Sequence, residues 1–148
     1  MEFEIYNFSK FKINKKKLQE NLSKISKFLK IDKALIRIFF INSKEIRKIN
    51  KKFRNKNRST TVISLKYQDF KVIDKNLLGE IYLSIDDIKN QNQFFQKTKL
   101  ADIINYYLIH GLLHLIGYDH STIKSAKIME NKQAKILEVL NKWAKTIN

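Results

Sequence analysis

The chain has 148 residues and contains no cysteine, so disulfides, thiolate metal sites and thiol nucleophiles are excluded. Its length fits a single domain over residues 1–148, large enough to bury roughly 70% of the surface that the unfolded chain exposes. Thirty Lys and Arg residues against 14 Asp and Glu give a formal net charge of +16. This charge favours a polyanionic partner such as RNA or the ribosome over the alternative, which is lysine enrichment by biased codon usage.

The sequence predicts no membrane attachment. No segment reaches the roughly 18 uninterrupted apolar residues that a membrane span needs. The first six residues, Met1–Tyr6, lack a basic region followed by an apolar run, so they do not resemble a signal peptide. We therefore expect a cytoplasmic protein, and the absence of cysteine is consistent with a reducing compartment.

The first half of the chain alternates predicted strands and helices. In chain order the pattern indicates a strand at 2–8, a helix from an Asn14 cap to about Leu29, a buried strand at 34–41, and a short helix capped by Asn42 or Ser43. The strand segments are rich in β-branched and aromatic residues. The helical segments follow a capping residue and carry apolar residues every three or four positions.

The second half of the chain is mostly helical after two further strands. The pattern predicts strands at 60–65 and 77–84, a helix that Ser84 or Asp86 opens and that runs past Phe94 and Phe95, an apolar helix at 101–116, and a last helix from Ser121 or Thr122 to about Lys145. This order fits an α+β or α/β arrangement. We predict α+β, with a single four-stranded mixed sheet packed with about five helices.

All three histidines of the chain lie within eleven residues. His110 and His114 are four residues apart on the apolar helix, so their rings project from one face. Gly117 offers an exit from this helix, and a short turn brings His120 back toward the same point. The pattern predicts a metal site at the end of the central apolar helix, with these three histidines as ligands.

Three imidazoles without a fourth protein donor match the layout of a catalytic zinc site, where water occupies the fourth position and has a pKa near about 7. The ligand type alone also admits Ni²⁺ or Fe²⁺. In H-E-x-x-H metallopeptidases a glutamate follows the first histidine, but this chain has Gly111 there. That difference weakens a peptidase interpretation. We expect the small Gly111 to permit close approach of a neighbouring backbone.

The run His110–His120 (H-G-L-L-H-L-I-G-Y-D-H) resembles the H-G-x-L-H-L-x-G-Y-D-H signature of the YbeY family, bacterial metal-dependent endoribonucleases also called rRNA maturation factors. Every fixed position of the signature is present. Other segments are similar to further elements of the family: Ile49–Asn50 with Phe53–Arg54, Thr60–Leu65, Leu78–Ile81 with Ser84, and the spacing of Met129, Gln133, Ile136 and Leu137.

The resemblance implies a zinc ion bound by His110, His114 and His120. It also implies cleavage of single-stranded RNA, with a role in small-subunit ribosomal RNA maturation and ribosome quality control. The important arginine of the family falls on Arg54. A guanidinium can donate two hydrogen bonds to a phosphate and stabilise the negative charge that builds on the scissile phosphoryl group. The alternative for Arg54 is a solvated arginine at a helix end.

Some positions depart from the family pattern or admit two interpretations. The family has an acidic or amide residue where this chain has Thr61, and Phe-Pro where it has Leu65–Lys66. It has Asp where this chain has Glu80. None of these residues is a predicted ligand. Asp119 either orients a histidine or shapes the turn before His120.

Two other functions stay open. One is a ribosome-associated assembly factor whose metal is structural, closed by a fourth ligand such as Asp119. The other is another metallohydrolase. The sequence specifies neither a protein partner nor an oligomeric state.

Overall fold

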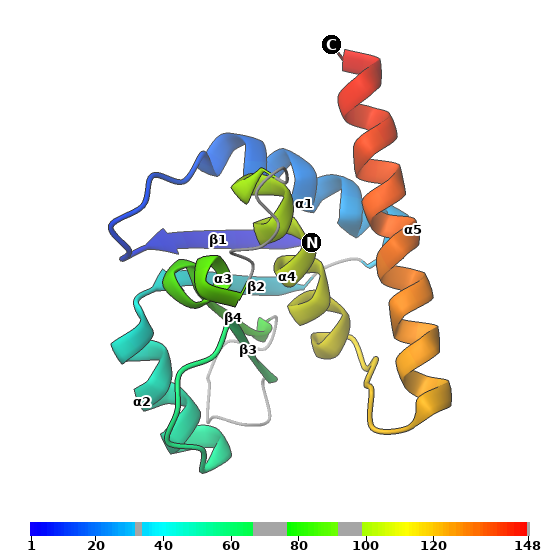
Figure 1. The fold of residues 1–148 in the computed structure, drawn as a ribbon. Helices are drawn as coiled ribbons and strands as arrows, with labels where there is room; N and C mark the ends of the chain where they lie inside the picture. The colour runs from blue at the N-terminus through cyan, green and yellow to red at the C-terminus, as the bar shows by residue number, and fades with distance from the viewer. Residues whose placement is uncertain (32–33, 67–76, 92–98, 148) are drawn as a thin grey trace.

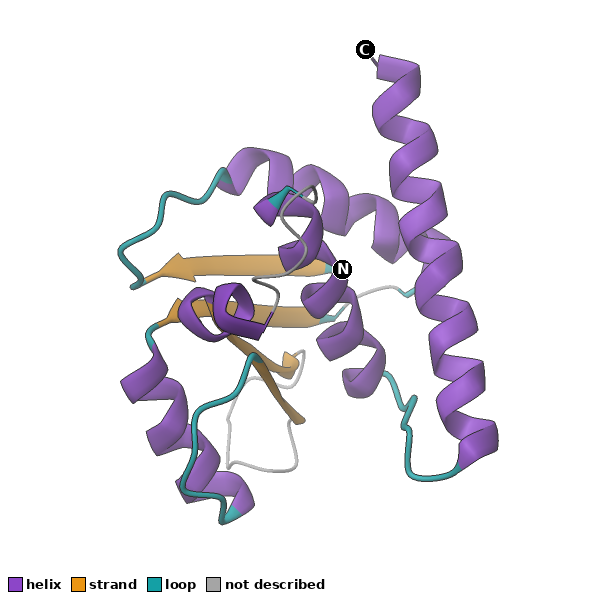
Figure 2. Cartoon of the chain, in the orientation of Figure 1, coloured by secondary structure: helices purple, strands orange, loops and turns teal. Residues whose placement is uncertain are grey.

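The computed structural model describes residues 1–31, 34–66, 77–91 and 99–147, with side chains described as far as residue 141. Within these ranges, strands and helices follow the predicted order (Figure 2). They are β1 (Glu2–Asn7), α1 (Lys15–Leu29), β2 (Leu35–Ile41), α2 (Ser43–Arg54), β3 (Val62–Lys66), β4 (Leu77–Ser84), α3 (Ile85–Gln91), α4 (Leu100–Leu115) and α5 (Ile123–Ile147).

The described strands form one mixed sheet in the order β1-β2-β4-β3. β1, β2 and β4 run parallel, whereas β3 runs antiparallel to β4 and lies at the edge. Figure 1 shows α1 beyond β1, α5 alongside α1 and α4, and α2 placed apart from these three helices. This arrangement confirms the predicted α+β fold with one four-stranded mixed sheet and five helices in the described part of the chain.

The larger apolar core lies between one face of the sheet and helices α1, α3, α4 and α5. Alternate residues of β2 point to this face, so Ile36, Ile38 and Phe40 are completely buried. They pack with Leu22 of α1 and Leu108 of α4, in a cluster that also includes Met129 and Ile136 of α5. These contacts fix α4, the helix that carries two of the histidines, against the sheet.

A smaller apolar core lies under the opposite face. Ile46 of α2 packs there with Ile41 of β2 and with Ile63 and Leu65 of β3. Alternate side chains of a strand point to opposite faces, so Ile41 points away from the face that carries Ile36, Ile38 and Phe40. α2 therefore covers the face of the sheet that α4 does not cover. Its C-terminal residue, Arg54, is thereby carried to the region of the edge strand β3.

The capping residues explain where three helices begin. Asn14 Oδ1 accepts from the Lys17 N–H at 3.1 Å, Asn42 Oδ1 accepts from Glu45 N–H at 2.9 Å, and Thr122 Oγ1 accepts from Ser125 N–H at 3.0 Å. The structure thus selects Asn42 over Ser43 and Thr122 over Ser121. The predicted bounds differ from the observed ones by one or two residues. Phe94 and Phe95, expected to lie within the helix after β4, fall outside the described residues.

Among the described helices, none has the length and apolar character required to span a bilayer.

Candidate metal centre

α4 holds the first two histidines against the sheet through a close contact at Gly111. The Ser64 hydroxyl of β3 donates to the Gly111 carbonyl oxygen at 2.9 Å. A Cβ atom at Gly111 would lie 2.9 Å from Ser64 Oγ and 3.1 Å from Ile81 Cγ2. The neighbours that require glycine are therefore side chains, and the expectation of a close backbone was wrong. Glycine therefore lets α4 pack closely against β3.

Gly117 ends the helix and turns the chain back, as predicted. Its N–H donates to the His114 carbonyl oxygen at 3.2 Å, and the Tyr118 N–H donates to that of Leu113 at 3.0 Å. This pair of bonds is a Schellman motif, which requires a residue with positive φ. Gly117 supplies it with a φ of 108°. The turn brings His120 beside the helix it has just left.

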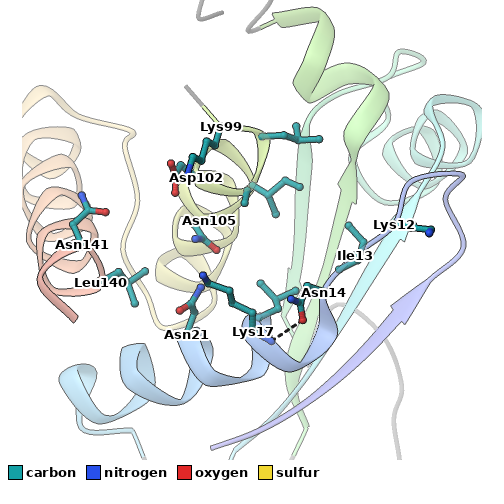
Figure 3. Close-up of a pocket in the computed structure, with 14 residues that line it drawn as sticks. Lys12, Ile13, Asn14, Lys17, Asn21, Lys99, Asp102, Asn105, Leu140 and Asn141 are labelled. Atoms are coloured by element: carbon teal, nitrogen blue, oxygen red, sulfur yellow. Dashed lines mark hydrogen bonds between the residues drawn. The ribbon is translucent and has the colours of Figure 1, made fainter. Parts of the chain in front are cut away.

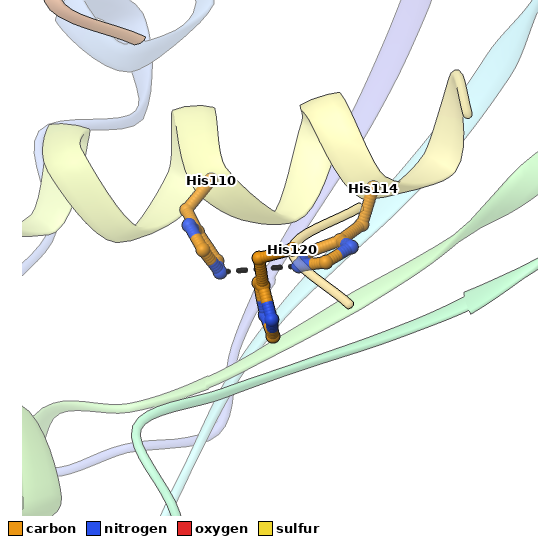
Figure 4. Close-up of side chains that lie close together, drawn as sticks. All are labelled: His110, His114 and His120. Atoms are coloured by element: carbon orange, nitrogen blue, oxygen red, sulfur yellow. Dashed lines mark hydrogen bonds between the residues drawn. The ribbon is translucent and has the colours of Figure 1, made fainter. Parts of the chain in front are cut away.

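The three histidine side chains converge (Figure 4). The Nε2 atoms of His110 and His114 lie 3.1 Å apart. Taking one ring nitrogen from each residue, the three atoms lie within 4.8 Å of one another. His110 and His114 are half-buried, whereas His120 is exposed. The structure therefore brings together all three residues that the sequence predicts as ligands, with a solvent-facing side.

Burial keeps the two helix histidines neutral. It is the main cause that lowers the pKa of His114 to about 4, and the neighbouring His110, His120 and Arg54 charges lower it further. Burial also lowers the pKa of His110, against a hydrogen bond to Gln133 that raises it. Neutral imidazole is the form that ligates metals, so neither ring must lose a proton at neutral pH before binding an ion.

Gln133 of α5 orients His110. Its Oε1 lies 3.4 Å from His110 Nδ1, and its Nε2 donates to the Tyr106 carbonyl oxygen at 2.9 Å. Because the second bond fixes the amide, Oε1 is the acceptor and Nδ1 carries the proton. His110 Nε2 is then left with its lone pair toward the other histidines. Sequence analysis named Gln133 only as one of four positions whose spacing is similar to that of the family, and did not connect it to the site.

Arg54 reaches the same region from the other layer of the fold. Its Nη2 donates to the Ser64 carbonyl oxygen at 3.1 Å. The Ser84 N–H donates to the Thr61 carbonyl oxygen, so the backbone of Thr61 faces β4. In an antiparallel pair every second residue bonds to the neighbouring strand, so the Ser64 carbonyl points the other way, toward the free edge of β3. Arg54 and His114 line the same pocket of about 200 Å³, whose lining also includes Ser64, Lys66, Gly117 and Asp119.

Asp119 belongs to the turn. Its Oδ1 accepts from the backbone N–H and the hydroxyl of Ser121, at 3.3 Å and 3.1 Å. Hydrogen bonds from Ser125 and Ser121 lower the pKa of Asp119. Within the described residues the metal-ligand cluster consists of histidines alone. These contacts favour the turn-shaping interpretation of Asp119 over a role as a fourth ligand.

Three imidazole nitrogens form a donor set of the kind that zinc accepts. Zinc binds imidazole nitrogen at about 2.0–2.1 Å, so two ligating nitrogens can be at most about 4 Å apart. The 3.1 Å between the Nε2 atoms of His110 and His114 lies within that limit. The three ring nitrogens together lie within 4.8 Å of one another, so the His120 ring has to close by a small distance for all three to share an ion. The cluster could therefore hold a metal ion.

Pocket size does not identify this site. A larger pocket, of about 670 Å³, lies between α1, the start of α4 and α5 (Figure 3). Lys12, Lys17 and Lys99 line it together with several amides, and one of these, Asn14, caps α1 by accepting from the Lys17 N–H. None of the predicted site residues contributes to it.

Fold and site together define an α+β protein with a candidate three-histidine metal centre, and comparison with known proteins identifies its family. Residues 4–141 match the family model described as endoribonuclease YbeY. The chain is 35% identical over 142 residues to the endoribonuclease YbeY of Malacoplasma penetrans, covering 93% of this chain and 94% of that relative. It is 38% identical over 129 residues to that of Buchnera aphidicola subsp. Schizaphis graminum, covering 87% and 81%.

A solved structure agrees. The solution structure of a Thermotoga maritima protein aligns with a TM-score of 0.65 and 28% sequence identity, over 97% of this chain and 93% of that one. The chain therefore belongs to the endoribonuclease YbeY family, a family of nucleases of the hydrolase class. The resemblance noted in the sequence is confirmed.

Proposed function

We propose that this protein is a zinc-dependent endoribonuclease that cleaves single-stranded RNA at the site formed by His110, His114, His120 and Arg54. The observation that carries the proposal is the convergence of three ring nitrogens within 4.8 Å of one another, beside a pocket that Arg54 lines. Zinc held by three imidazoles supplies Lewis acidity and lowers the pKa of water to about 7.

The chain's own residues have distinct tasks in this proposal. Arg54 has five N–H donors, so it can keep its bond to the Ser64 carbonyl while it binds oxygens of a phosphate. Its charge then offsets the negative charge that develops on the phosphoryl group. Gln133 keeps His110 in the tautomer whose Nε2 lone pair faces the site. The Schellman turn at Gly117 holds His120 in reach.

We further propose that the RNA substrate is ribosomal, that the protein acts in small-subunit rRNA maturation and ribosome quality control, and that it works in the cytoplasm. Family membership and the +16 charge support this role. Depleting the protein should cause unprocessed small-subunit rRNA to accumulate, and wild-type protein, but not His114→Ala, should restore processing. Normal rRNA ends after depletion would contradict the role.

Metal content and cleavage test the activity together. Purified protein should contain one zinc ion per chain and degrade single-stranded RNA, with duplex RNA much less affected. His114→Ala should lose both the metal and cleavage while its thermal unfolding remains cooperative. If cleavage persists after chelation at the same level in the wild-type and the His114→Ala preparations, a contaminating nuclease is responsible. Persistence in the wild-type preparation alone would refute metal dependence.

The coordination number separates this proposal from an assembly factor with a structural metal. X-ray absorption of the zinc-loaded protein should show three imidazole nitrogens and one oxygen that exchanges with solvent. Four protein ligands would instead favour a structural site. The histidine-only cluster among the described residues supports the first outcome.

A further inference from the structure

α2 presents a basic stripe that begins at the candidate site. Lys44, Arg47, Lys51 and Arg54 are all exposed. At about 100° per residue, these four side chains lie within about 80° of one another around the helix. The buried Ile46 lies about 120° from the centre of this arc, and the buried Asn50 lies at its edge, about 40° from Arg54. One end of the stripe, Arg54, lines the pocket that contains His114.

The loop after α2 adds a further positive charge to this stripe. Asn50 Nδ2 donates to the Arg58 carbonyl oxygen at 2.9 Å, and Arg47 Nε donates to Asn57 Oδ1 at 2.9 Å. These bonds fold the loop back along the helix. They create a second pocket, of about 580 Å³, which is lined by Ser43, Lys44, Arg47, Asn57, Arg58 and Ser59.

The acidic residues near the stripe already have partners. Glu45 lies 3.4 Å from Lys48 Nζ. Asp87 accepts from the hydroxyls of Ser59 and Ser84. Asp87 keeps its negative charge because both its partners are neutral hydroxyls, but this one carboxylate does not balance the cations of the stripe and Arg58. From Arg54 to Lys44 the stripe is about 15 Å long at a rise of about 1.5 Å per residue.

We propose that Lys44, Arg47, Lys51 and Arg58 form a track for the phosphodiester backbone of single-stranded RNA, running from the metal centre along α2 to the pocket at Lys44. The inference rests on the proposed endoribonuclease function and adds the path of the substrate. A strand with one phosphate for every 3.4 Å or more places at most about four phosphates on the track. The contacts are ionic and made to phosphates, so they hold the strand without reading its sequence.

The salt dependence of RNA binding tests the track. The variant Lys44→Gln/Lys51→Gln/Arg58→Gln removes three charges and keeps the bond between Arg47 and Asn57. Each phosphate contact to a single strand contributes about −0.7 to the slope of log affinity against log salt, so the slope should become shallower by about 2. When the salt concentration rises from about 50 to 200 mM, RNA affinity should fall by a factor that is about twenty times smaller for the variant than for the wild-type protein.

The matched control removes three exposed charges elsewhere. Lys16→Gln/Lys27→Gln/Lys135→Gln changes α1 and α5, whose buried side chains belong to the larger core on the opposite face of the sheet from α2. This control should keep the wild-type slope. Binding is measured by anisotropy of a labelled RNA on the zinc-loaded protein, while a gel shows that the strand is intact. The gap between wild type and track variant should widen as the strand lengthens from three to about six nucleotides.

The outcomes separate the two proposals. If the wild-type protein cleaves RNA but the two triple variants share its salt slope, the track is wrong and the activity stands. In that case the basic stripe is free to bind an acidic protein. If the wild-type protein does not cleave RNA, the proposed function fails, and a selectively shallower slope in the track variant still supports RNA binding along α2. Equal loss of slope in both triple variants overturns the track in favour of diffuse surface binding.

Discussion

Gln133 shows how one buried amide sets the state of a ligand. It is 4% exposed and bridges His110 and the Tyr106 carbonyl. We predict that Gln133→Met, which keeps the volume and removes both bonds, weakens zinc affinity by about 10- to 100-fold, because the His110 ring loses its orientation. A competing chelator dye measures this affinity.

Gln19 provides the matched control for this change. It is also a glutamine that donates to a backbone carbonyl, that of Phe3 at 2.8 Å, but it lies on α1. Gln19→Met should lower the free energy of unfolding while leaving zinc affinity unchanged. Equal zinc affinities in the two variants would show that Gln133 has no orienting role.

Glu80 is a half-buried carboxylate on the sheet, and it makes stability depend on pH. Burial is the main cause that raises its pKa above the usual 4.5, whereas the hydrogen bond from Tyr82 and the charge of Arg37 lower it. Because the folded pKa lies above the unfolded one, the native state binds more protons in the interval between them. The stability that Glu80 contributes is full below about pH 4.5 and is lost as the pH rises through the raised pKa.

The direction of this pH dependence can be measured. The free energy of unfolding of the wild-type protein minus that of Glu80→Gln should fall as the pH rises from 4 to 7, because glutamine does not titrate. Urea unfolding at a series of pH values measures it, and the other titrating groups cancel in the subtraction. A difference that rises with pH would mean that Arg37 and Tyr82 outweigh burial.

At the scale of elements, the packing of α4 against β3 depends on glycine at position 111. Gly111→Ala would place a Cβ 2.9 Å from Ser64 Oγ and 3.3 Å from Val62 Cγ2. We predict a loss of about 1–3 kcal/mol in the free energy of unfolding, as for other overpacked sites. Because Ser64→Ala removes the nearest atom, the double variant should lose less than the sum of the two single losses, as urea unfolding would show.

Gly117→Ala separates crowding from backbone strain. A Cβ at Gly117 would meet nothing within 4 Å, but the φ of 108° is unfavourable for alanine. This variant should lose about 1–2 kcal/mol, and adding Ser64→Ala should give no relief. If the losses from Gly111→Ala and Ser64→Ala were simply additive, the contact between α4 and β3 would not be the cause.

The elements and the histidines could be predicted because both depend on patterns along the chain. The helix repeat aligns His110 with His114, and a glycine exit returns His120. The bonds from Gln133 to His110 and from Arg54 to Ser64 could not be predicted, because they arise where α5 packs on α4 and where α2 meets the sheet edge. Gln133 did leave a signal: a polar side chain in the apolar stripe of the last helix, which invites a search for its partner.

Across the whole molecule, the site joins two layers that pack separately. α4 and the turn before α5 supply the histidines from the larger core, whereas α2 supplies Arg54 from the smaller core on the opposite face. The edge strand β3 links them, since Ser64 bonds Gly111 through its hydroxyl and Arg54 through its carbonyl. The sheet thus ties the position of the histidines to that of the arginine.

This arrangement predicts the effect of removing the metal. The described apolar cores pack without the histidines, so chelation should leave the far-ultraviolet circular dichroism unchanged and lower only the melting temperature. Zinc at a hundredfold excess over its dissociation constant adds about 2.7 kcal/mol of stability by binding the native state alone. The melting temperature of His110→Ala should be the same with and without zinc. Unfolding on chelation would instead show that the ion is part of the fold, as in structural zinc domains, and would favour the assembly-factor alternative over catalysis.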